Sequence, residues 1–127
     1  AYIGNQYHLE IFGEELFPDL LFLNRELNCM VVVELKKGAF KPSYIGQLQT
    51  YMKVLDDKVR KPHENPTIGI LLCKSANKAF VEYVIRDYNH PMGVATYKTA
   101  EDMSEELRKA LPDMDEMRKL LTDDGDI

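Results

Sequence analysis

Residues 16 to 36 read LFPDLLFLNRELNCMVVVELK, and this stretch decides the fold of the chain. Its two apolar runs, 16–23 and 29–36, are short and rich in residues that favour strands, and the polar residues 24–28 separate them. The stretch therefore predicts a β-hairpin. Three charged side chains lie toward the open end of that hairpin, namely Asp19, Glu34 and Lys36.

The expected pairing of the hairpin brings these charges together. We expect Leu23 to lie opposite Met30, and counting back from that pair places Asp19 opposite Glu34. Since side chains alternate between the faces of a sheet, Lys36 shares their face. Like charges directly opposite are destabilising and their burial costs more, so a cation, a shared proton or exposure at a cleft must compensate. Hard oxygen ligands suit Mg²⁺ or Mn²⁺ better than Zn²⁺.

These residues also carry a resemblance. Pro18-Asp19, a gap of fourteen residues and then Glu34-Leu35-Lys36 resemble the PD-(D/E)xK signature of the restriction-endonuclease-like nuclease superfamily. More narrowly, residues 4 to 97 are similar to the nuclease domain of the bacterial YhcG-type family. The matching segments are GNQYHLE at 4–10, DLLF at 19–22, ELK at 34–36, FKP at 40–42 and NPTIGILLC at 65–73.

The resemblance implies a restriction-endonuclease-like α/β fold, in which helices flank a mixed β-sheet built from an antiparallel meander plus parallel strands. It also implies a metal-dependent nuclease that hydrolyses DNA phosphodiester bonds with Mg²⁺ or Mn²⁺ as cofactor. The metal ligands would be Asp19, Glu34 and the backbone carbonyl of Leu35, and Lys36 would orient or help to deprotonate the attacking water. The spacing of these residues does not choose between DNA and RNA, nor between a structure-specific enzyme and a duplex cutter.

Residues 6–12 alternate in polarity and predict a strand whose polar face carries His8 and Glu10. The sequence Gly-Glu-Glu at 13–15 is the expected turn into the hairpin. A two-residue turn would place His8 opposite Asp19, and a four-residue loop would place Glu10 there instead. Both are candidate outer metal ligands or water-holding residues, and the alternative is a solvated polar face.

A helix is predicted over 43–59, because apolar residues recur there at spacings of three and four and Pro42 suits a first helical turn. Gln47 and Tyr51 lie on a stripe beside the apolar one. In the superfamily that the chain resembles, a helix after the E-x-K strand often presents a Gln and a Tyr toward the active site. The resemblance therefore makes Gln47 and Tyr51 candidate catalytic residues, whereas periodicity alone favours ordinary packing for Tyr51 and simple exposure for Gln47.

Farther along, the pattern predicts a buried strand at 67–73, a helix at 77–86 and a short last strand at 94–97. A helix of about four turns between two strands fits a crossover, so parallel strands should extend the antiparallel hairpin. We expect residues 1–99 to form the nuclease-like core. Residues 100–127 are expected to form an acidic helical extension that packs on the same domain, with a homodimer contact as the alternative.

The composition fits one globular domain of 127 residues with a net charge of −5, which argues mildly against a self-sufficient nucleic-acid binder. Carboxylates that hold a metal count as negative until the metal binds, and the excess of acidic over basic residues lies beyond residue 100. Cys29 and Cys73 fall inside apolar runs and are expected to be buried thiols. With no signal peptide and no membrane-length apolar run, we expect a cytoplasmic protein without a membrane partner.

The chain opens without Met in strand-like sequence, so we expect a longer protein whose preceding region could supply affinity for DNA. Two rivals to a nuclease remain open at the level of sequence. One is a non-catalytic nucleic-acid-binding or assembly module with a nuclease-like fold. The other is a purely structural ion-pair cluster of Asp19, Glu34 and Lys36 at a sheet edge.

Overall fold

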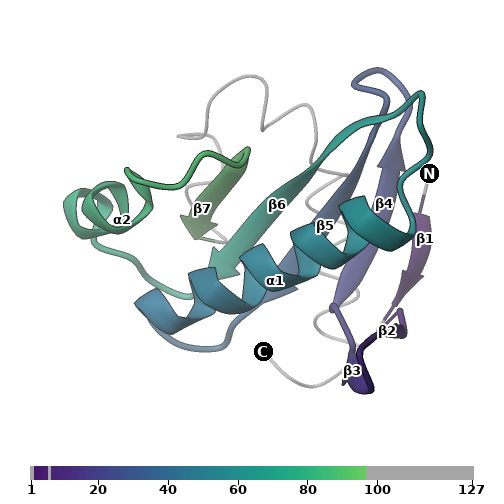
Figure 1. The fold of residues 1–127 in the computed structure, drawn as a ribbon. Coiled ribbons are helices and arrows are strands. Elements are labelled where there is room, and N and C mark those ends of the chain that lie inside the picture. Colours follow the sequence, from purple (N-terminus) through teal and green to yellow (C-terminus); the bar gives the residue numbers. More distant parts are fainter. Residues whose placement is uncertain (1, 6, 97–127) are drawn as a thin grey trace.

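The computed structural model describes residues 2–5 and 7–96. Five strands form one mixed sheet in the order β1-β4-β5-β6-β7, and two short strands, β2 and β3, form a second sheet (Figure 1). The elements are β1 (Tyr2–Asn5), β2 (Leu9–Ile11), β3 (Glu14–Leu16), β4 (Leu20–Asn24), β5 (Cys29–Leu35), α1 (Pro42–Lys58), β6 (Asn65–Cys73), α2 (Lys78–Ile85) and β7 (Met92–Thr96).

The hairpin of β4 and β5 has the register that the sequence predicts. Leu23 lies opposite Met30, and the ladder runs on to Leu20 opposite Val33. Polar residues close its loop, because Asn24 Oδ1 accepts a hydrogen bond of 2.9 Å from the backbone N–H of Leu27. The loop ends at Asn28, whose φ of 51° lies in the left-handed region that Asn tolerates better than most residues.

Parallel strands extend this hairpin on one side, as expected for the restriction-endonuclease-like fold. β5 pairs in parallel with β6, and β6 in parallel with β7, while β1 pairs antiparallel with β4 on the other side. α1 and α2 supply the two crossovers, and Figure 1 shows α1 lying along one face of the sheet. Residues of both helices join the same core cluster, so the two crossovers cover the same face.

The buried side chains recur along each element at the spacing expected for a helix or a strand. The apolar stripe of α1 is at most 1% exposed and packs on alternate residues of β5 and β6, such as Val32 and Leu71. The intervening residues, such as Val33 and Ile70, form a second cluster on the opposite face of the sheet. α1 approaches β6 closely at Gly69, where an added Cβ would collide with Met52. The buried stripe consists of Ile45, Leu48, Met52 and Leu55.

The start of the chain differs from the prediction. The strand that pairs with β4 is β1, whereas β2 pairs only with β3 across a two-residue turn at Phe12 and Gly13. Both turn residues have positive φ, 50° and 83°, which is the conformation that tight hairpin turns require. Glu14 and Glu15 are therefore strand residues, and the predicted turn at 13–15 is wrong.

The second crossover helix and the last strand lie close to their predicted positions. Asn77 caps α2, since its Oδ1 accepts a hydrogen bond of 3.2 Å from the backbone N–H of Phe80. Neither helix in the part of the chain that the structure describes is both long and apolar enough to cross a membrane. The predicted helical extension at 100–127 lies outside the described residues.

Candidate active site

Asp19 and Glu34 meet where the β4–β5 hairpin opens. Asp19 directly precedes β4, and Glu34 is the next-to-last residue of β5. The backbone N–H of Asp19 donates to Glu34 Oε1 at 3.0 Å, and the backbone N–H of Leu35 donates to Asp19 Oδ2 at 2.9 Å. The predicted proximity of the two carboxyl groups is thus confirmed. Each one is held by the backbone of the other's strand, so their relative position does not depend on flexible side chains alone.

The Glu34 side chain is almost fully buried, with 2% of its surface exposed. Burial, and next the charge of Asp19, raise the pKa of Glu34 from 4.5 to about 8. The hydrogen bond from the Asp19 backbone and the charge of Lys36 act in the opposite direction. Two carboxyl groups in this setting cannot both ionise cheaply at neutral pH without a cation beside them.

Lys36 directly follows β5 and connects the sheet to α1. Its backbone N–H donates to the carbonyl of Leu72 at 2.8 Å, which continues the parallel ladder past the end of the strand. Its Nζ donates to Gln47 Oε1 at 2.8 Å and lies 4.6 Å from the centroid of the Tyr44 ring. The ammonium group is therefore held by α1 at the position where the carboxyl pair and the helix meet.

Gln47 and Tyr51 extend this arrangement along the helix. Gln47 Nε2 lies 3.0 Å from the Tyr51 hydroxyl, so the amide joins Lys36 to Tyr51. Tyr51 is 6% exposed and belongs to the core cluster. Its pKa is raised by burial first and by the charge of Glu34 second. The structure thus brings both helix residues toward Lys36, and it also supports the packing interpretation of the Tyr51 ring.

Tyr44 is a neighbour of the site that the sequence did not assign to it. Its ring lies beneath the ammonium groups of Lys36 and Lys41, at 4.6 and 5.9 Å from the centroid. A cation over an aromatic ring is stabilised by the electron-rich face of the ring. The available signal was its position three residues before Gln47, on the same helical stripe.

Glu10 lies in β2 of the small second sheet and His8 directly precedes that strand, so neither has the predicted register. Glu10 lies opposite Glu15, and neither residue is paired with Asp19, so that part of the prediction is wrong. His8 Nε2 lies 3.3 Å from Glu15 Oε1, and its ring stacks on Phe17 with centroids 5.0 Å apart. Within residues 7–96, no group of three or more His, Cys, Asp or Glu side chains is arranged to hold a metal ion.

Comparison with known proteins agrees with this geometry. The family model described as the YhcG PDDEXK nuclease domain matches residues 1–112. The chain belongs to this family. The protein "Putative nuclease YhcG" of Escherichia coli (strain K12) is 33% identical over 98 residues. That alignment covers 77% of this chain and 26% of the relative, so the chain spans about a quarter of the relative's length. No solved structure matches the chain.

The resemblance seen in the sequence is therefore confirmed, and the chain is a YhcG-type PDDEXK nuclease domain. Within it, Pro18-Asp19 and Glu34-Leu35-Lys36 stand where the mixed sheet brings the ends of β4 and β5 together. Hydrogen bonds join Lys36, Gln47 and Tyr51 to one another, and the charge of Lys36 acts on the Glu34 carboxyl group. We refer to these five residues, Asp19, Glu34, Lys36, Gln47 and Tyr51, as the hairpin-end site.

Proposed function

We propose that this domain hydrolyses DNA phosphodiester bonds with the aid of Mg²⁺ or Mn²⁺ at the hairpin-end site. The observation that carries the proposal is the buried Glu34 carboxyl group held against Asp19, with Lys36 two residues farther along the chain. A structural ion-pair cluster does not require one carboxyl group to be 2% exposed beside another. A site that binds a hard cation does benefit from that arrangement.

The donor set fits a divalent cation. Each carboxyl group accepts a backbone N–H with one oxygen, and a hydrogen bond between the two side chains also raises the pKa of Glu34. A bound cation would take the place of the proton that the two carboxyl groups share. Together with the backbone carbonyl of Leu35, Asp19 and Glu34 would offer only hard oxygen donors, the kind that Mg²⁺ prefers. A cation bound there supplies charge neutralisation at the phosphate and lowers the pKa of a water molecule. The role of His8 and Glu10 as outer metal ligands stays a prediction.

Lys36 is the residue proposed to act on the substrate. Its ammonium group is held by Gln47 at 2.8 Å, and its charge acts on the Glu34 carboxyl group. There it would stabilise negative charge that develops on the phosphate and orient the attacking water. Gln47 is a positioning residue in this scheme, because it holds the Lys36 ammonium group and is itself held by the Tyr51 hydroxyl.

The choice of DNA over RNA, a cytoplasmic location and a homodimer stay predictions. The relative is about four times longer than the aligned segment. We propose that a region outside this chain adds affinity for nucleic acid, since the net charge of −5 gives the domain little general attraction for phosphates.

A cleavage assay tests the proposal directly. Supercoiled plasmid and labelled oligonucleotides would be incubated with the wild-type chain and Mg²⁺, Mn²⁺ or a chelator, beside Lys36→Ala and the matched exposed control Lys53→Ala. We expect metal-dependent cleavage that Lys36→Ala lowers by about a hundredfold or more and that Lys53→Ala leaves intact. Equal cleavage by wild type and Lys36→Ala would remove Lys36 from the mechanism. Binding of nucleic acid without any cleavage would favour the non-catalytic module.

A further inference from the structure

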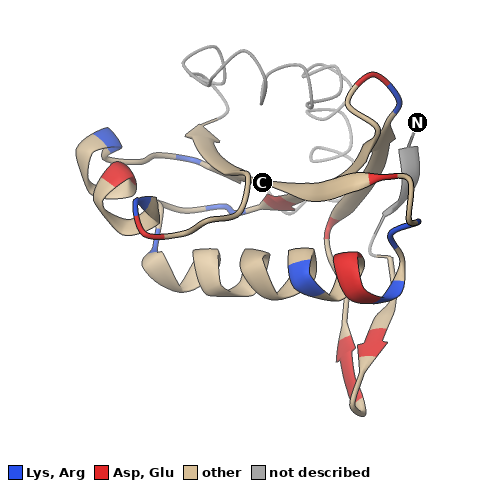
Figure 2. Ribbon diagram, turned by 45° about the horizontal axis from the view of Figure 1, so that its top comes forward, with Lys and Arg blue, Asp and Glu red and all other residues tan. Residues whose placement is uncertain are grey.

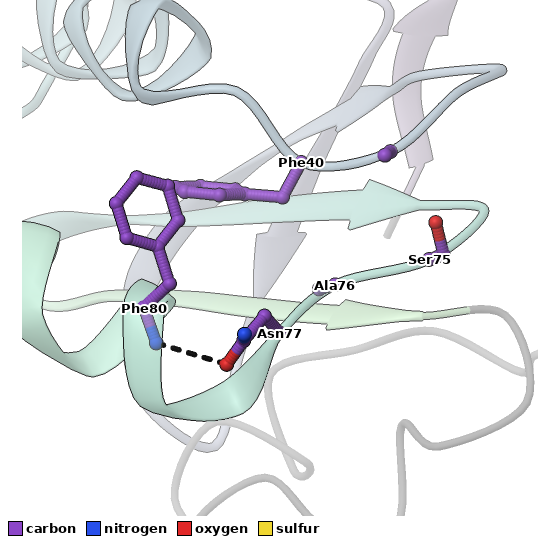
Figure 3. Close-up of a pocket in the computed structure, with 6 residues that line it drawn as sticks. Phe40, Ser75, Ala76, Asn77 and Phe80 are labelled. Atoms are coloured by element: carbon purple, nitrogen blue, oxygen red, sulfur yellow. Dashed lines mark hydrogen bonds between the residues drawn. The ribbon is translucent and has the colours of Figure 1, made fainter.

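A cavity of about 480 Å³ opens between the loop that follows β5 and the loop that precedes α2 (Figure 3). Its walls combine two aromatic rings with small and polar side chains. We refer to it as the phenylalanine pocket. It is lined by Ala39, Phe40, Ser75, Ala76, Asn77 and Phe80.

The two rings present an open aromatic surface. Phe40 is 8% exposed and Phe80 is 45% exposed. Their centroids are 6.0 Å apart and their planes meet at 77°, so Phe40 supports Phe80 edge to face and leaves part of the Phe80 ring uncovered. In Figure 3 the Ser75 hydroxyl and the Asn77 amide lie on the loop that leads to α2. Asn77 uses its Oδ1 to cap the helix, and its amide nitrogen can still donate.

The pocket is a continuation of the strands that carry the hairpin-end site. β5 and β6 remain paired past their ends, where the N–H of Lys74 donates to the Gly38 carbonyl and the N–H of Phe40 donates to the Ser75 carbonyl, both at 2.9 Å. Ala39 follows Lys36 by three residues, so their Cα atoms are at most about 11 Å apart. If a phosphate of a bound nucleic-acid strand lies at Lys36, a neighbouring nucleotide of that nucleic acid is therefore within reach of the pocket.

Charge complementarity also points to nucleic acid. The loops 36–41 and 74–78 contain lysines and no Asp or Glu, although the whole chain carries a net charge of −5. Figure 2 shows blue segments along these two loops. The exposed members are Lys37, Lys41, Lys74 and Lys78. Positive side chains on both sides of an aromatic pocket are the combination that binds single strands, with phosphates outside and a base on the ring.

We propose that the phenylalanine pocket receives an unstacked nucleobase of the strand being cut, which directs the domain to nucleic acid with unpaired nucleotides beside the scissile phosphate. This inference rests on the proposed function. The base would stack on Phe80, with the Asn77 amide and the Ser75 hydroxyl available for its polar edge. Within an intact duplex every base is already stacked and paired, so a duplex cannot fill the pocket without losing that stacking.

Binding assays separate this inference from the proposed function. Fluorescence anisotropy would measure the affinity of the 127-residue chain for a single-stranded oligonucleotide and for its duplex, in a Lys36→Ala background so that binding is read without cleavage. Phe80→Ala removes the stacking ring, and its partly exposed position makes the change tolerable to the fold. Tyr83→Ala is the matched control, because Tyr83 is an aromatic residue of α2 that is 63% exposed and does not line the pocket.

We expect Phe80→Ala to weaken single-strand binding by about tenfold or more, while duplex binding and the Tyr83→Ala variant stay within about twofold of the parent. An abasic site moved along the oligonucleotide should reproduce the loss at one position, and should have no further effect in Phe80→Ala. Single-strand binding that is indifferent to Phe80→Ala, an equal loss for duplex, or no measurable binding would overturn the inference. Cleavage by the wild-type chain is read separately, so a pocket that binds without cleavage would refute only the proposed function.

Discussion

The stability of the metal-free domain should depend on pH through one buried carboxyl group. The pKa of Glu34 is about 8 in the folded protein, against an ordinary value of 4.5. Between these two values the unfolded chain releases a proton that the folded protein keeps. The free energy of unfolding therefore falls as pH rises from 4.5 to 8, by about 1.4 kcal/mol per pH unit and about 5 kcal/mol in total, and then levels off.

Replacing Glu34 by Gln should remove this slope. Glutamine keeps an oxygen that can accept the Asp19 backbone N–H at the same place, yet it does not ionise. Urea unfolding in the presence of a chelator, at several pH values between 5 and 9, would measure the free energy of unfolding of both proteins. We expect the variant to be about equal to wild type near pH 5 and more stable above pH 8, by up to about 5 kcal/mol.

The exposed Glu14→Gln is the matched control and should leave the wild-type slope unchanged. If Glu34→Gln loses stability with pH as steeply as wild type, the slope comes from other groups and the reasoning about Glu34 is refuted. Added Mn²⁺ should also flatten the wild-type slope, since a bound cation favours the ionised form of Glu34.

Substitutions at Gln47, Gly69 and Gly46 test how α1 faces the site and packs on β6. Gln47→Ala removes the hydrogen bonds to Lys36 and Tyr51, so it should lower kcat by about tenfold or more while KM changes little, and Gln47→Glu should shift the pH profile of cleavage. A side chain at Gly69 would collide with Met52, so Gly69→Ala should lower the free energy of unfolding by about 1–3 kcal/mol in urea. Gly46→Ala, at an exposed position of α1 with open space at its Cβ, should instead be neutral or stabilise by up to about 1 kcal/mol.

The central hairpin could be predicted in detail because its constraints are local. The two apolar runs follow each other directly, and the short polar loop at 24–28 leaves little choice of pairing between them. The positions of Asp19 and Glu34 follow from that register. The position of α1 could also be predicted, since its buried stripe continues over the whole helix.

The prediction for the start of the chain was wrong for an equally local reason. The sequence Gly-Glu-Glu predicted a turn at 13–15, but the structure places the turn at Phe12 and Gly13, with Phe12 also in the left-handed region that aromatic residues seldom adopt. That change places Glu14 and Glu15 in a strand and leaves neither His8 nor Glu10 paired with Asp19.

The phenylalanine pocket could not be predicted because its two walls are far apart in sequence. Phe40 and Phe80 meet only because β5 and β6 stay paired beyond their last regular residues. The approach of Gln47 to Lys36 likewise depends on how α1 crosses the sheet. Periodicity placed Gln47 on the surface of the helix, and only the resemblance to the nuclease superfamily indicated the direction in which it points.

Calorimetric titration of Mn²⁺ into the metal-free domain tests the central claim most directly. The titration would be run side by side on the wild type, Asp19→Asn, Glu34→Gln and Lys36→Ala. We predict binding to the wild type and to Lys36→Ala, and loss of binding in both carboxyl variants, because the two carboxyl groups supply the side-chain ligands. No binding to the wild type, or binding that neither carboxyl substitution changes, would contradict a metal site at the end of the β4–β5 hairpin.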